Sequence, residues 1–488
     1  MNTKATPDRP DHLEIAAGEP SRLFDANKRF TGRLVSIFGE NTGGRTILHY
    51  LVDLPGHGYQ DFEYAVAGPV RSLTPISPAA SWHEREVHEC FNVEFAGHPA
   101  LKPLLHHAGR QDGRTPVDGQ RDSQFLEVQG EGVCEVPVGP VHAGIIEPGH
   151  FRFSVVGDTV LHLQLKLFYT HKGTEKLFEN MAVSEAVPLA ESVSGDNCFA
   201  HAVAYCQAVE QLHGAELPAK ANAIRLIGLE VERLLAHIGD FGALCGDVAF
   251  TVPAAYCARI KEDLLRASAE TIGTRYWRGI ALPGGVRQDL AAAVARQFRE
   301  AIRVAAEDFF AIGEQALNTP SVEDRFEEAG VLARSVATDL AVVGPVARAS
   351  GIPLDVRRDH PYGPYKSISF NVPTMDSGDV MARARIRIEE ARTSARLILD
   401  CLQALPKGPF HRPLSDAATG SAFAAVESPR GELLYWLRLE EGRIKRCHVR
   451  SPSFQNWPAL PLAVAGNIIA DFPLINKSFN LSYSGCDR

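Results

Sequence analysis

The sequence predicts an α+β protein, in which a small N-terminal α/β domain precedes a large, mainly helical domain that is entered through a β-hairpin segment. Two observations support this prediction. Strand-like runs alternate with turn residues over residues 28–70, and from about residue 174 apolar residues recur at three- and four-residue spacing over long stretches. The chain has 488 residues, enough for about three average domains and a large buried core.

The N-terminal part contains short strands and one helix. The runs Arg33–Phe38 and Thr46–Val52 are predicted strands on either side of an Asn-Thr-Gly-Gly turn, and residues 82–91 have helical spacing. Residues 108–128 are polar and glycine-rich without periodicity, which predicts a linker. The predicted organisation is an extended or disordered N-terminus over 1–27, a first domain over 28–107, a linker over 108–130 and a second domain over 131–488.

The second domain is predicted to be a helical bundle with strands at both ends. Hairpin strands are expected within residues 131–167, and a closing segment of strands and loops is expected over 427–488. Five long amphipathic stretches between them have lengths that suit a bundle better than a mixed sheet. They are Phe199–His213, Asn222–Asp240, Ala255–Ile272, Gln288–Leu317 and Gly378–Leu405.

Composition and charge exclude several classes of protein. The chain has 50 basic and 59 acidic residues and a formal net charge of −9, whereas nucleic-acid binders are strongly basic. Its first ten residues lack the apolar core of a secretory signal, and no run of about 18 apolar residues is present to span a membrane. We therefore expect a cytoplasmic location and no nucleic-acid partner.

The cysteines predict neither disulfides nor a cysteine metal site. There are nine, an odd number spread thinly through a chain with no export signal, so a disulfide framework is not expected. No Cys-x-x-Cys pair occurs. A dinucleotide fingerprint and a phosphate-binding glycine loop are also missing, so we do not expect this chain to bind NAD(H).

One predicted helix carries a possible charge relay. Glu230, Arg233 and His237 share a face of the 222–240 helix, where an acid, a guanidinium and an imidazole could form a proton relay or a buried ion network. A structural salt bridge explains the same pattern equally well. Arginine, aspartate and glycine are also concentrated in residues 344–362 and 378–390, in patterns that suit buried ion pairs or anionic ligands.

The chain from about residue 136 to its end resembles the large subunit of the complex I and membrane-bound nickel–iron hydrogenase superfamily. It is most similar to the energy-converting branch that contains formate hydrogenlyase and hydrogenase-4. Residues 28–105 are similar to the C-type subunit of NADH dehydrogenase, through residues 84–86 and 95–99, so a C-type and a D-type subunit appear fused. The matching segments of the larger part are residues 139–142, 147–152, 169–176, 237–247, 283–286, 427–432, 450–454 and 487–488, with the two arginine-rich stretches.

The resemblance implies a metal site whose ligands this chain lacks. Nickel–iron hydrogenases hold their metals with four thiolates from two Cys-x-x-Cys motifs, because soft sulfur suits these metals. The aligned positions here are Ser194, Asn197, Ser482 and Gly485. Cys198 and Cys486 each lie one residue beyond a ligand position, which turns a helical side chain by about 100°. We therefore expect no nickel–iron centre and no hydrogenase activity.

In complex I the corresponding cavity binds the quinone headgroup through a His, a Tyr and an Asp, as the resemblance implies. The Asp position is Asp247, and the Tyr position is Gly195. The His position falls near Pro148, between His142 and His150. Quinone is therefore the one candidate ligand of this chain, contacted by His142, His150 and the space at Gly195.

These observations favour one function and leave two alternatives. The preferred interpretation is the large hydrophilic subunit of a complex-I-like oxidoreductase, which passes electrons to an acceptor such as quinone and is coupled to ion translocation. Its expected partners are an iron–sulfur small subunit and ion-translocating membrane subunits, which would hold it on the inner face of the cell membrane. Glu230, Arg233, His237 and Asp247 would form the charge relay, while Arg348, Asp355 and Arg385 would hold the bundle and a partner surface.

The first alternative is a non-catalytic subunit that supports assembly. The second is a binuclear metal enzyme that uses oxygen ligands such as Asp196 and the Ser194, Asn197 and Ser482 side chains. Hydroxyl and amide groups are poor ligands without several carboxylates, which disfavours the second alternative.

Overall fold

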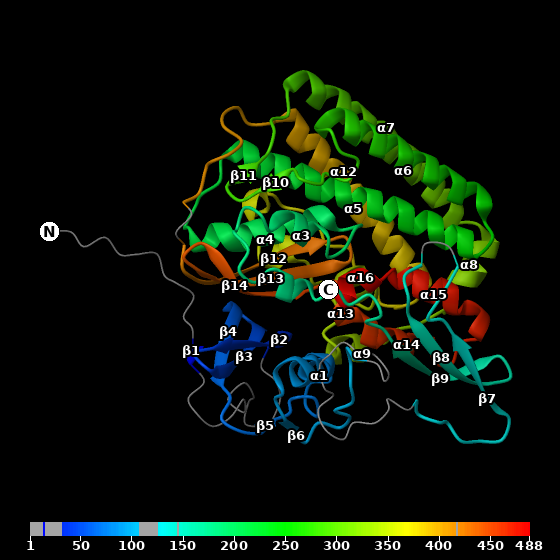
Figure 1. Ribbon diagram of the computed structural model, residues 1–488. Coiled ribbons are helices and arrows are strands. Elements are labelled where there is room, and N and C mark those ends of the chain that lie inside the picture. The colour runs from blue at the N-terminus through cyan, green and yellow to red at the C-terminus, as the bar shows by residue number, and fades with distance from the viewer. Residues whose placement is uncertain (1–12, 15–31, 107–124, 144–145, 416–417) are drawn as a thin grey trace. The chain divides into compact units, whose positions relative to one another are not determined.

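The computed structural model describes residues 13–14, 32–106, 125–143, 146–415 and 418–488 (Figure 1). The chain divides into two compact units, one formed by residues 1–125 with 339–341, and the other by residues 126–338 and 342–488. The division falls within the predicted linker 108–130. The predicted N-terminal segment 1–27 and most of that linker lie outside the described residues.

The first unit contains a four-stranded sheet in the order β1-β4-β3-β2. Helix α1 (Ala80–Phe91) follows it, and Val87 on this helix shares an apolar core with Leu34, Leu48 and Tyr50 of the sheet. Gly43 and Gly44 link β2 and β3. Their positive φ angles of 57° and 75° are the backbone conformation that a tight hairpin turn requires. The strands are β1 (Leu13–Glu14), β2 (Arg33–Thr42), β3 (Arg45–Leu54), β4 (Gly58–Ala65), β5 (Val70–Arg71) and β6 (Phe95–Ala96).

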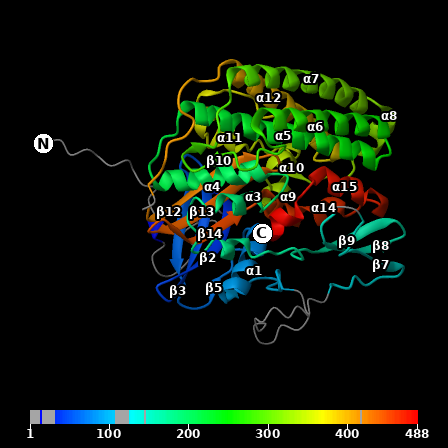
Figure 2. The same ribbon diagram turned by 45° about the horizontal axis from the view of Figure 1, so that its top comes forward.

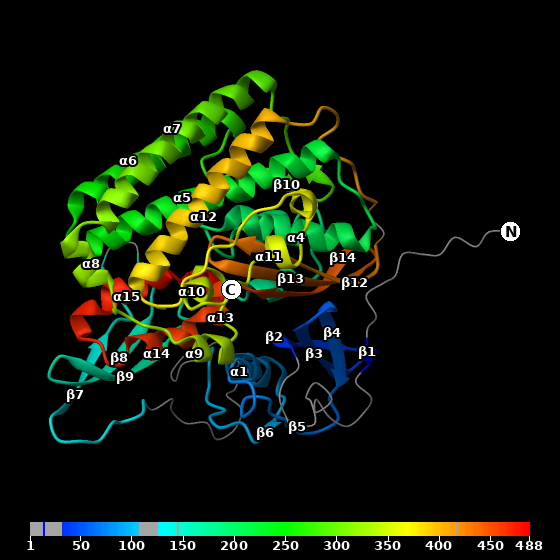
Figure 3. The same cartoon turned by 180° about the vertical axis from the view of Figure 1, so that it is seen from behind.

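Long helices form the interior of the second unit. Helix α5 (Ala219–Asp247) is buried along most of its length, and α12 (Val380–Gln403) packs against it, as seen from behind in Figure 3. Helices α6 (Thr251–Ile272) and α7 (Ala292–Leu317) form the outer layer on α5 and α12 (Figure 2). These helices, with α4 (Cys198–Leu212), correspond to the five predicted amphipathic stretches, and the predicted helical bundle is confirmed.

Two three-stranded antiparallel sheets flank the helices. β7-β8-β9 is the predicted hairpin entry segment, and β12-β13-β14 packs against α4. β10 and β11 form a separate two-stranded hairpin. The strands are β7 (Val133–Val138), β8 (His150–Val156), β9 (Thr159–Lys166), β10 (Ala281–Leu282), β11 (Gly285–Val286), β12 (Gly420–Ser428), β13 (Gly431–Glu440) and β14 (Arg443–Arg450).

The C-terminal segment differs from its prediction. Residues 427–450 contain strands, but most of residues 452–487 are helical rather than strand and loop. Helices α13, α14 and α15 each have a proline at their first or second residue, which is tolerated in the first turn of a helix, where the missing N–H has no partner to lose. The helices are α13 (Pro452–Asn456), α14 (Leu460–Val464), α15 (Phe472–Phe479) and α16 (Tyr483–Asp487).

The remaining short helices connect these layers. They are α2 (Thr174–Leu177), α3 (Val187–Glu191), α8 (Pro320–Phe326), α9 (Arg334–Asp339), α10 (Gly344–Ala349), α11 (Val356–Asp359) and the 3-10 turns η2 (Gly363–Ser367), η3 (Trp457–Ala459) and η4 (Ile469–Asp471). Among the helices of the described residues, none is both long and apolar enough to cross a lipid bilayer.

Candidate functional site

The four positions at which the resemblance implies cysteines come from two distant segments. Asn197 is the N-cap of α4, and Ser482 is the N-cap of α16. The hydroxyl of Ser194 lies 3.1 Å from the hydroxyl of Ser482, which is 288 residues away in the sequence. A Cβ atom added to Gly485 would lie 3.1 Å from the Ser482 hydroxyl and 3.3 Å from the Ser194 Cβ. We call these four residues the replacement site.

An arginine links the two segments of the replacement site. Arg430 Nη1 donates to Asn197 Oδ1 at 2.9 Å, its Nη2 pairs with Asp196, and its Nε donates to the carbonyl of Asn480. The Ser194 hydroxyl also donates to Asp196 Oδ1 at 2.7 Å. The polar groups of this site therefore satisfy one another through hydrogen bonds and one ion pair.

These residues do not fit a nickel–iron pair. Such metals take thiolate ligands, whereas this site offers two hydroxyls, one amide that already accepts from a guanidinium, and a glycine. The neighbouring thiols are unsuitable as well, since Cys198 is buried with its sulfur 3.2 Å from the carbonyl of Tyr276, and burial raises the pKa of this thiol far above its usual value. Cys486 is also fully buried.

The loop between β7 and β8 packs onto α16. Glu147 Oε2 accepts from the backbone N–H of Ser484 at 2.8 Å, and a side chain at Gly149 would clash with the ring of Tyr483. Two histidines hold the base of this loop: His142 bonds to the carbonyl of Gly149 at 2.7 Å, and His150 bonds to the carbonyl of Gly139 at 3.1 Å.

The chain end holds α16 in position. The carboxylate of Asp487 accepts from the backbone N–H groups of Phe168 at 2.9 Å and Thr170 at 3.0 Å, and from the Thr170 hydroxyl at 2.6 Å. Lys172 Nζ donates to the Ser484 hydroxyl at 2.7 Å and to the carbonyl of Ser192 at 2.9 Å. These bonds join residues 168–172 to α16.

Behind this site, ionisable side chains form a fully buried cluster around α5. Glu230 accepts from Arg357 Nη1 at 3.0 Å, from Arg233 Nε at 3.2 Å and from the Ser394 hydroxyl at 2.6 Å, and it also bonds to the Tyr365 hydroxyl. Burial alone would raise the pKa of Glu230, but the two guanidiniums outweigh it and lower this pKa to about 2.

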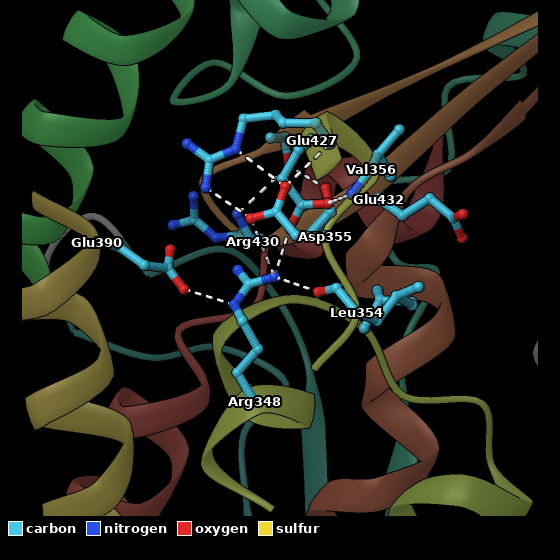
Figure 4. Close-up of polar contacts among 12 residues, drawn as sticks. Arg348, Leu354, Asp355, Val356, Glu390, Glu427, Arg430 and Glu432 are labelled. Atoms are coloured by element: carbon cyan, nitrogen blue, oxygen red, sulfur yellow. Dashed lines mark hydrogen bonds and ion pairs between the residues drawn. The ribbon is translucent and has the colours of Figure 1, made fainter. Parts of the chain in front are cut away.

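Arg348 joins two further carboxylates, as Figure 4 shows. Its Nε donates to Glu390 Oε1 at 2.6 Å, and its Nη1 donates to Glu427 Oε1 at 2.9 Å and to the carbonyl of Leu354 at 2.6 Å. The other oxygen of Glu390 lies 2.9 Å from His237 Nε2. Burial lowers the pKa of His237 despite this carboxylate.

Asp355 and Glu427 complete the cluster. Asp355 holds Arg357 through two side-chain hydrogen bonds, of 3.0 and 2.6 Å. Glu427 Oε2 accepts from the backbone N–H of Val356 at 3.0 Å, and its backbone carbonyl accepts from Arg233 Nη2 at 2.5 Å. We call the cluster the charge network; its members are Glu230, Arg233, His237, Arg348, Asp355, Arg357, Glu390 and Glu427.

Comparison with known proteins decides the family. The family model for the respiratory-chain NADH dehydrogenase 49 Kd subunit matches residues 247–418 and 413–488, and the model for its 30 Kd subunit matches residues 48–117. Hydrogenase-4 component G of Escherichia coli is 34% identical over 434 residues, covering 86% of this chain and 75% of the relative. The chain belongs to the fused C/D-type subunits of complex I and the energy-converting hydrogenases.

Other relatives come from both branches of this family. Formate hydrogenlyase subunit 5 of Escherichia coli is 32% identical over 435 residues, which cover 86% of this chain and 76% of the relative. The fused C/D polypeptide of the NADH-quinone oxidoreductase of Methylococcus capsulatus is 26% identical over 507 residues, which cover 91% of this chain and 86% of the relative. The resemblance deduced from the sequence motifs is confirmed.

The structure brings together only part of the relay expected for this C/D-type subunit. Glu230, Arg233 and His237 all lie in the charge network. Asp247 lies ten residues beyond His237, about 15 Å along the helix, where it is exposed. Partial burial of its carboxyl raises the pKa of Asp247, although the nearby Lys477 opposes this shift. Within the described part of the chain, no hydrogen bond or ion pair joins Asp247 to the network.

Several members of the charge network were not predicted from the sequence. Glu390 and Glu427 were not singled out, although they occupy the arginine-rich and C-terminal motifs, because neither lies near the α5 residues in sequence. Arg348 and Asp355 were assigned partly to a partner surface; this is wrong, since both side chains are 0% exposed. Arg385 is only partly buried.

Glu232 was also missed. Its carboxylate caps α4 from the neighbouring helix, by accepting from the backbone N–H of Phe199 at 2.7 Å and of Ala200 at 3.0 Å. Burial raises the pKa of Glu232 to about 8 even though these bonds favour the charged form. No pattern in the sequence indicates a cap supplied by a different helix.

The first unit has its own buried acidic cluster. His49 Nδ1 lies 3.1 Å from both carboxylate oxygens of Asp61 and 4.0 Å from Glu63 Oε1, and its Nε2 lies 3.6 Å from Glu40 Oε2. Burial lowers the pKa of His49, but the bonds to Asp61 and Glu40 outweigh it and raise the value to about 9. The cluster pairs a cationic imidazole with carboxylates across neighbouring strands of the sheet.

Proposed function

We propose that this chain is the large hydrophilic subunit of a membrane-associated, complex-I-like oxidoreductase that transfers electrons to a quinone and has no nickel–iron centre. One observation carries the proposal. The four residues of the replacement site meet in space, as ligands of a metal would, yet they offer hydroxyl, amide and glycine groups that hydrogen-bond to one another and to Arg430. An oxidoreductase with this site cannot pass electrons to protons at a nickel centre and needs another electron acceptor.

The surroundings of Gly195 favour a planar organic acceptor. Gly195 is exposed, and a Cβ atom added there would have one neighbour within 4 Å, Arg278 Nη2 at 3.7 Å. In complex I this position carries a quinone-binding tyrosine, as the resemblance implies, so space is available where that ring would lie. We propose that His142, His150 and Asp247 surround the headgroup. An iron–sulfur small subunit would donate the electrons, and membrane subunits would move ions.

A second candidate is a structural subunit without electron transfer. The hydrogen bonds of the site favour it. Ser194 bonds to Asp196, and Arg430 bonds to Asn197 and pairs with Asp196, so these groups bind one another rather than a ligand. The oxygen-ligand metal enzyme is disfavoured, since Asp196, the one carboxylate among its proposed ligands, is already paired with Arg430.

The test uses the assembled membrane complex, purified through this chain. We expect it to reduce a short-chain quinone, to contain no nickel by elemental analysis, and to evolve no hydrogen from reduced viologen. Stoichiometric nickel or hydrogen evolution would contradict the proposal. An intact complex that contains an iron–sulfur subunit but reduces no quinone would favour the structural role.

A substitution locates the acceptor. Gly195→Trp fills the proposed space, so we expect the KM for quinone to rise at least about tenfold while the complex still assembles. Gly68→Trp is the matched control, because Gly68 is also exposed and has nothing within 4 Å of an added Cβ atom. Equal kinetics in the two variants would show that quinone does not bind at Gly195.

A further inference from the structure

The charge network contains one more carboxylate than guanidinium. The carboxylates belong to Glu230, Asp355, Glu390 and Glu427, and the guanidiniums belong to Arg233, Arg348 and Arg357. Every one of these side chains is at most 1% exposed. An uncompensated charge in such an interior is costly, and a buried acid without a countercharge binds a proton instead.

Neighbouring ion pairs do not remove this excess. Arg387, one turn before Glu390 on α12, bonds to Asp240 at 3.2 Å, so this pair adds no net charge. Arg430 is paired with Asp196. Arg383 donates to the Ser478 hydroxyl and to backbone carbonyls, away from the network.

His237 is a poor place for the extra proton. Its Nε2 bonds to Glu390, but its Nδ1 is buried and has no hydrogen-bond partner among the described residues. A charged imidazolium carries N–H donors on both nitrogens, so protonation would leave a buried donor without an acceptor. The neutral form, with its proton on Nε2 toward Glu390, also leaves Nδ1 unpaired in the described part of the molecule, but as an uncharged acceptor.

Glu427 is the carboxylate with the weakest cationic contacts. Asp355 receives two N–H groups of Arg357, and Glu230 is bonded to both Arg233 and Arg357. Glu390 and Glu427 share Arg348. Glu390 accepts from its Nε at 2.6 Å and also bonds to His237, whereas Glu427 accepts from its Nη1 at 2.9 Å and from one backbone N–H.

The groups that face Glu427 come from four helical elements and from β13, on which Glu432, opposite Glu427 in the hairpin, is paired with Arg450. Arg348 on α10 and Arg233 on α5 are the cations, with Arg357 on α11 farther away. Asp355 caps α11 as an anion, and the Tyr362 hydroxyl before η2 accepts from the Glu427 backbone N–H at 3.2 Å. Burial, with Asp355 nearby, raises the pKa of Glu427 to about 7, whereas the pKa values of Glu230, Asp355 and Glu390 are lowered.

We propose that Glu427 is a proton-binding site, at which the charge network takes up and releases one proton. With the proton on the Glu427 carboxyl the network is neutral; its release to solvent or to an adjacent carrier leaves one negative charge. Glu427 is three residues from Arg430 on the β12–β13 hairpin, so charge that develops at the replacement site would change its proton affinity. Its use in ion translocation rests on the proposed function, but the existence of the site does not.

Infrared difference spectroscopy of the full chain tests the site directly. The C=O stretch of a buried protonated carboxylic acid is followed from about pH 5 to about pH 9, a range that brackets the pKa of about 7. We expect a carboxylic acid band that disappears with a midpoint near pH 7 and is absent from Glu427→Gln. Glu232, with a pKa of about 8, gives a second band in the same range, which Glu232→Gln removes. A Glu427→Gln spectrum identical to that of the unmodified chain overturns the proposal.

Three variants make the assignment specific. Glu390→Gln removes one negative charge from the network, so the Glu427 band should lose its proton at least one pH unit lower. His237→Gln retains a donor for Glu390 and should leave the midpoint unchanged. Glu210→Gln alters a buried carboxylate that is bonded to Arg225 in a balanced pair, and the band should persist.

A midpoint that moves only in His237→Gln would assign the proton to the histidine and overturn the proposal. Because no measurement involves quinone, failure here is separable from failure of the proposed function.

Discussion

The replacement site and the charge network lie in the same unit, and both consist of polar side chains from segments far apart in sequence. At the replacement site, hydroxyl and amide groups pair with one another and with the Arg430–Asp196 ion pair, in which the Asp196 side chain is 48% exposed. The charge network is fully buried and has an excess carboxylate. The comparison teaches that neutral groups that hydrogen-bond to one another can be buried at little cost, whereas a buried excess charge must be matched by a proton.

The largest expected effect comes from returning thiols to the replacement site. A chain with Ser194→Cys, Asn197→Cys, Ser482→Cys and Gly485→Cys should bind one Zn²⁺, with a free energy of about 10 kcal/mol or more, because thiolates are strong zinc ligands and Arg430 favours their charged form. Elemental analysis after dialysis measures the metal. The same four positions changed to alanine are the control, and equal zinc in the two proteins would show that the segments do not converge.

Arg348→Met should have the next largest effect, a loss of about 3–5 kcal/mol in the free energy of unfolding, because it leaves Glu390 and Glu427 without their shared cation. Urea denaturation followed by circular dichroism measures it. Arg259→Met removes an arginine that is 49% exposed and paired with Asp263 and Asp308, and it should cost less than about 1 kcal/mol. Similar losses would mean that burial does not distinguish the two pairs.

The pH dependence of stability separates the two regions further. The pKa of Glu427 rises from 4.5 to about 7 on folding, so between these values the folded chain keeps a proton that the unfolded chain has released. Stability should therefore fall as pH rises through this window, by about 3 kcal/mol from this group, since one pKa unit corresponds to about 1.4 kcal/mol. Glu427→Gln should remove this fall.

Urea denaturation at several pH values measures the slope. Glu232 contributes a fall of the same sign up to about pH 8, but it is present in both proteins, so their difference isolates Glu427. Parallel curves for the two proteins would mean that Glu427 is ionised in the folded chain.

The smallest expected effect is that of Ser194→Ala. It removes hydrogen bonds to Asp196 and Ser482 but leaves the Arg430–Asp196 ion pair in place, so the free energy of unfolding should decrease by about 1 kcal/mol. Ser453→Ala, which removes a bond to the backbone N–H of Ser482 at 2.9 Å, is a matched comparison in the same region. If Ser194→Ala lowered the free energy of unfolding as much as Arg348→Met, the two regions would not differ in their contribution to stability.

Local patterns predicted the long helices well, because each has its own apolar stripe that sequence spacing reveals. The same patterns could not predict the short helices of residues 452–487, whose stability comes from packing rather than from their own periodicity. Glu230, Arg233 and His237 were found from their shared helix face. Glu390 and Glu427 were not, because their partner Arg348 lies 42 and 79 residues away, respectively.

The sequence by itself determined the family, the two kinds of domain and the absence of cysteine at the four positions where the resemblance implies metal ligands, since these depend on residue identity and order. Only the tertiary structure decided that Ser194, Ser482 and Gly485 touch, that Asp247 stands apart from the relay, and that Glu427 is the carboxylate without a full countercharge. The physical reason is that pairing and desolvation depend on the distances between side chains and on the solvent around them, and a linear order of residues specifies neither.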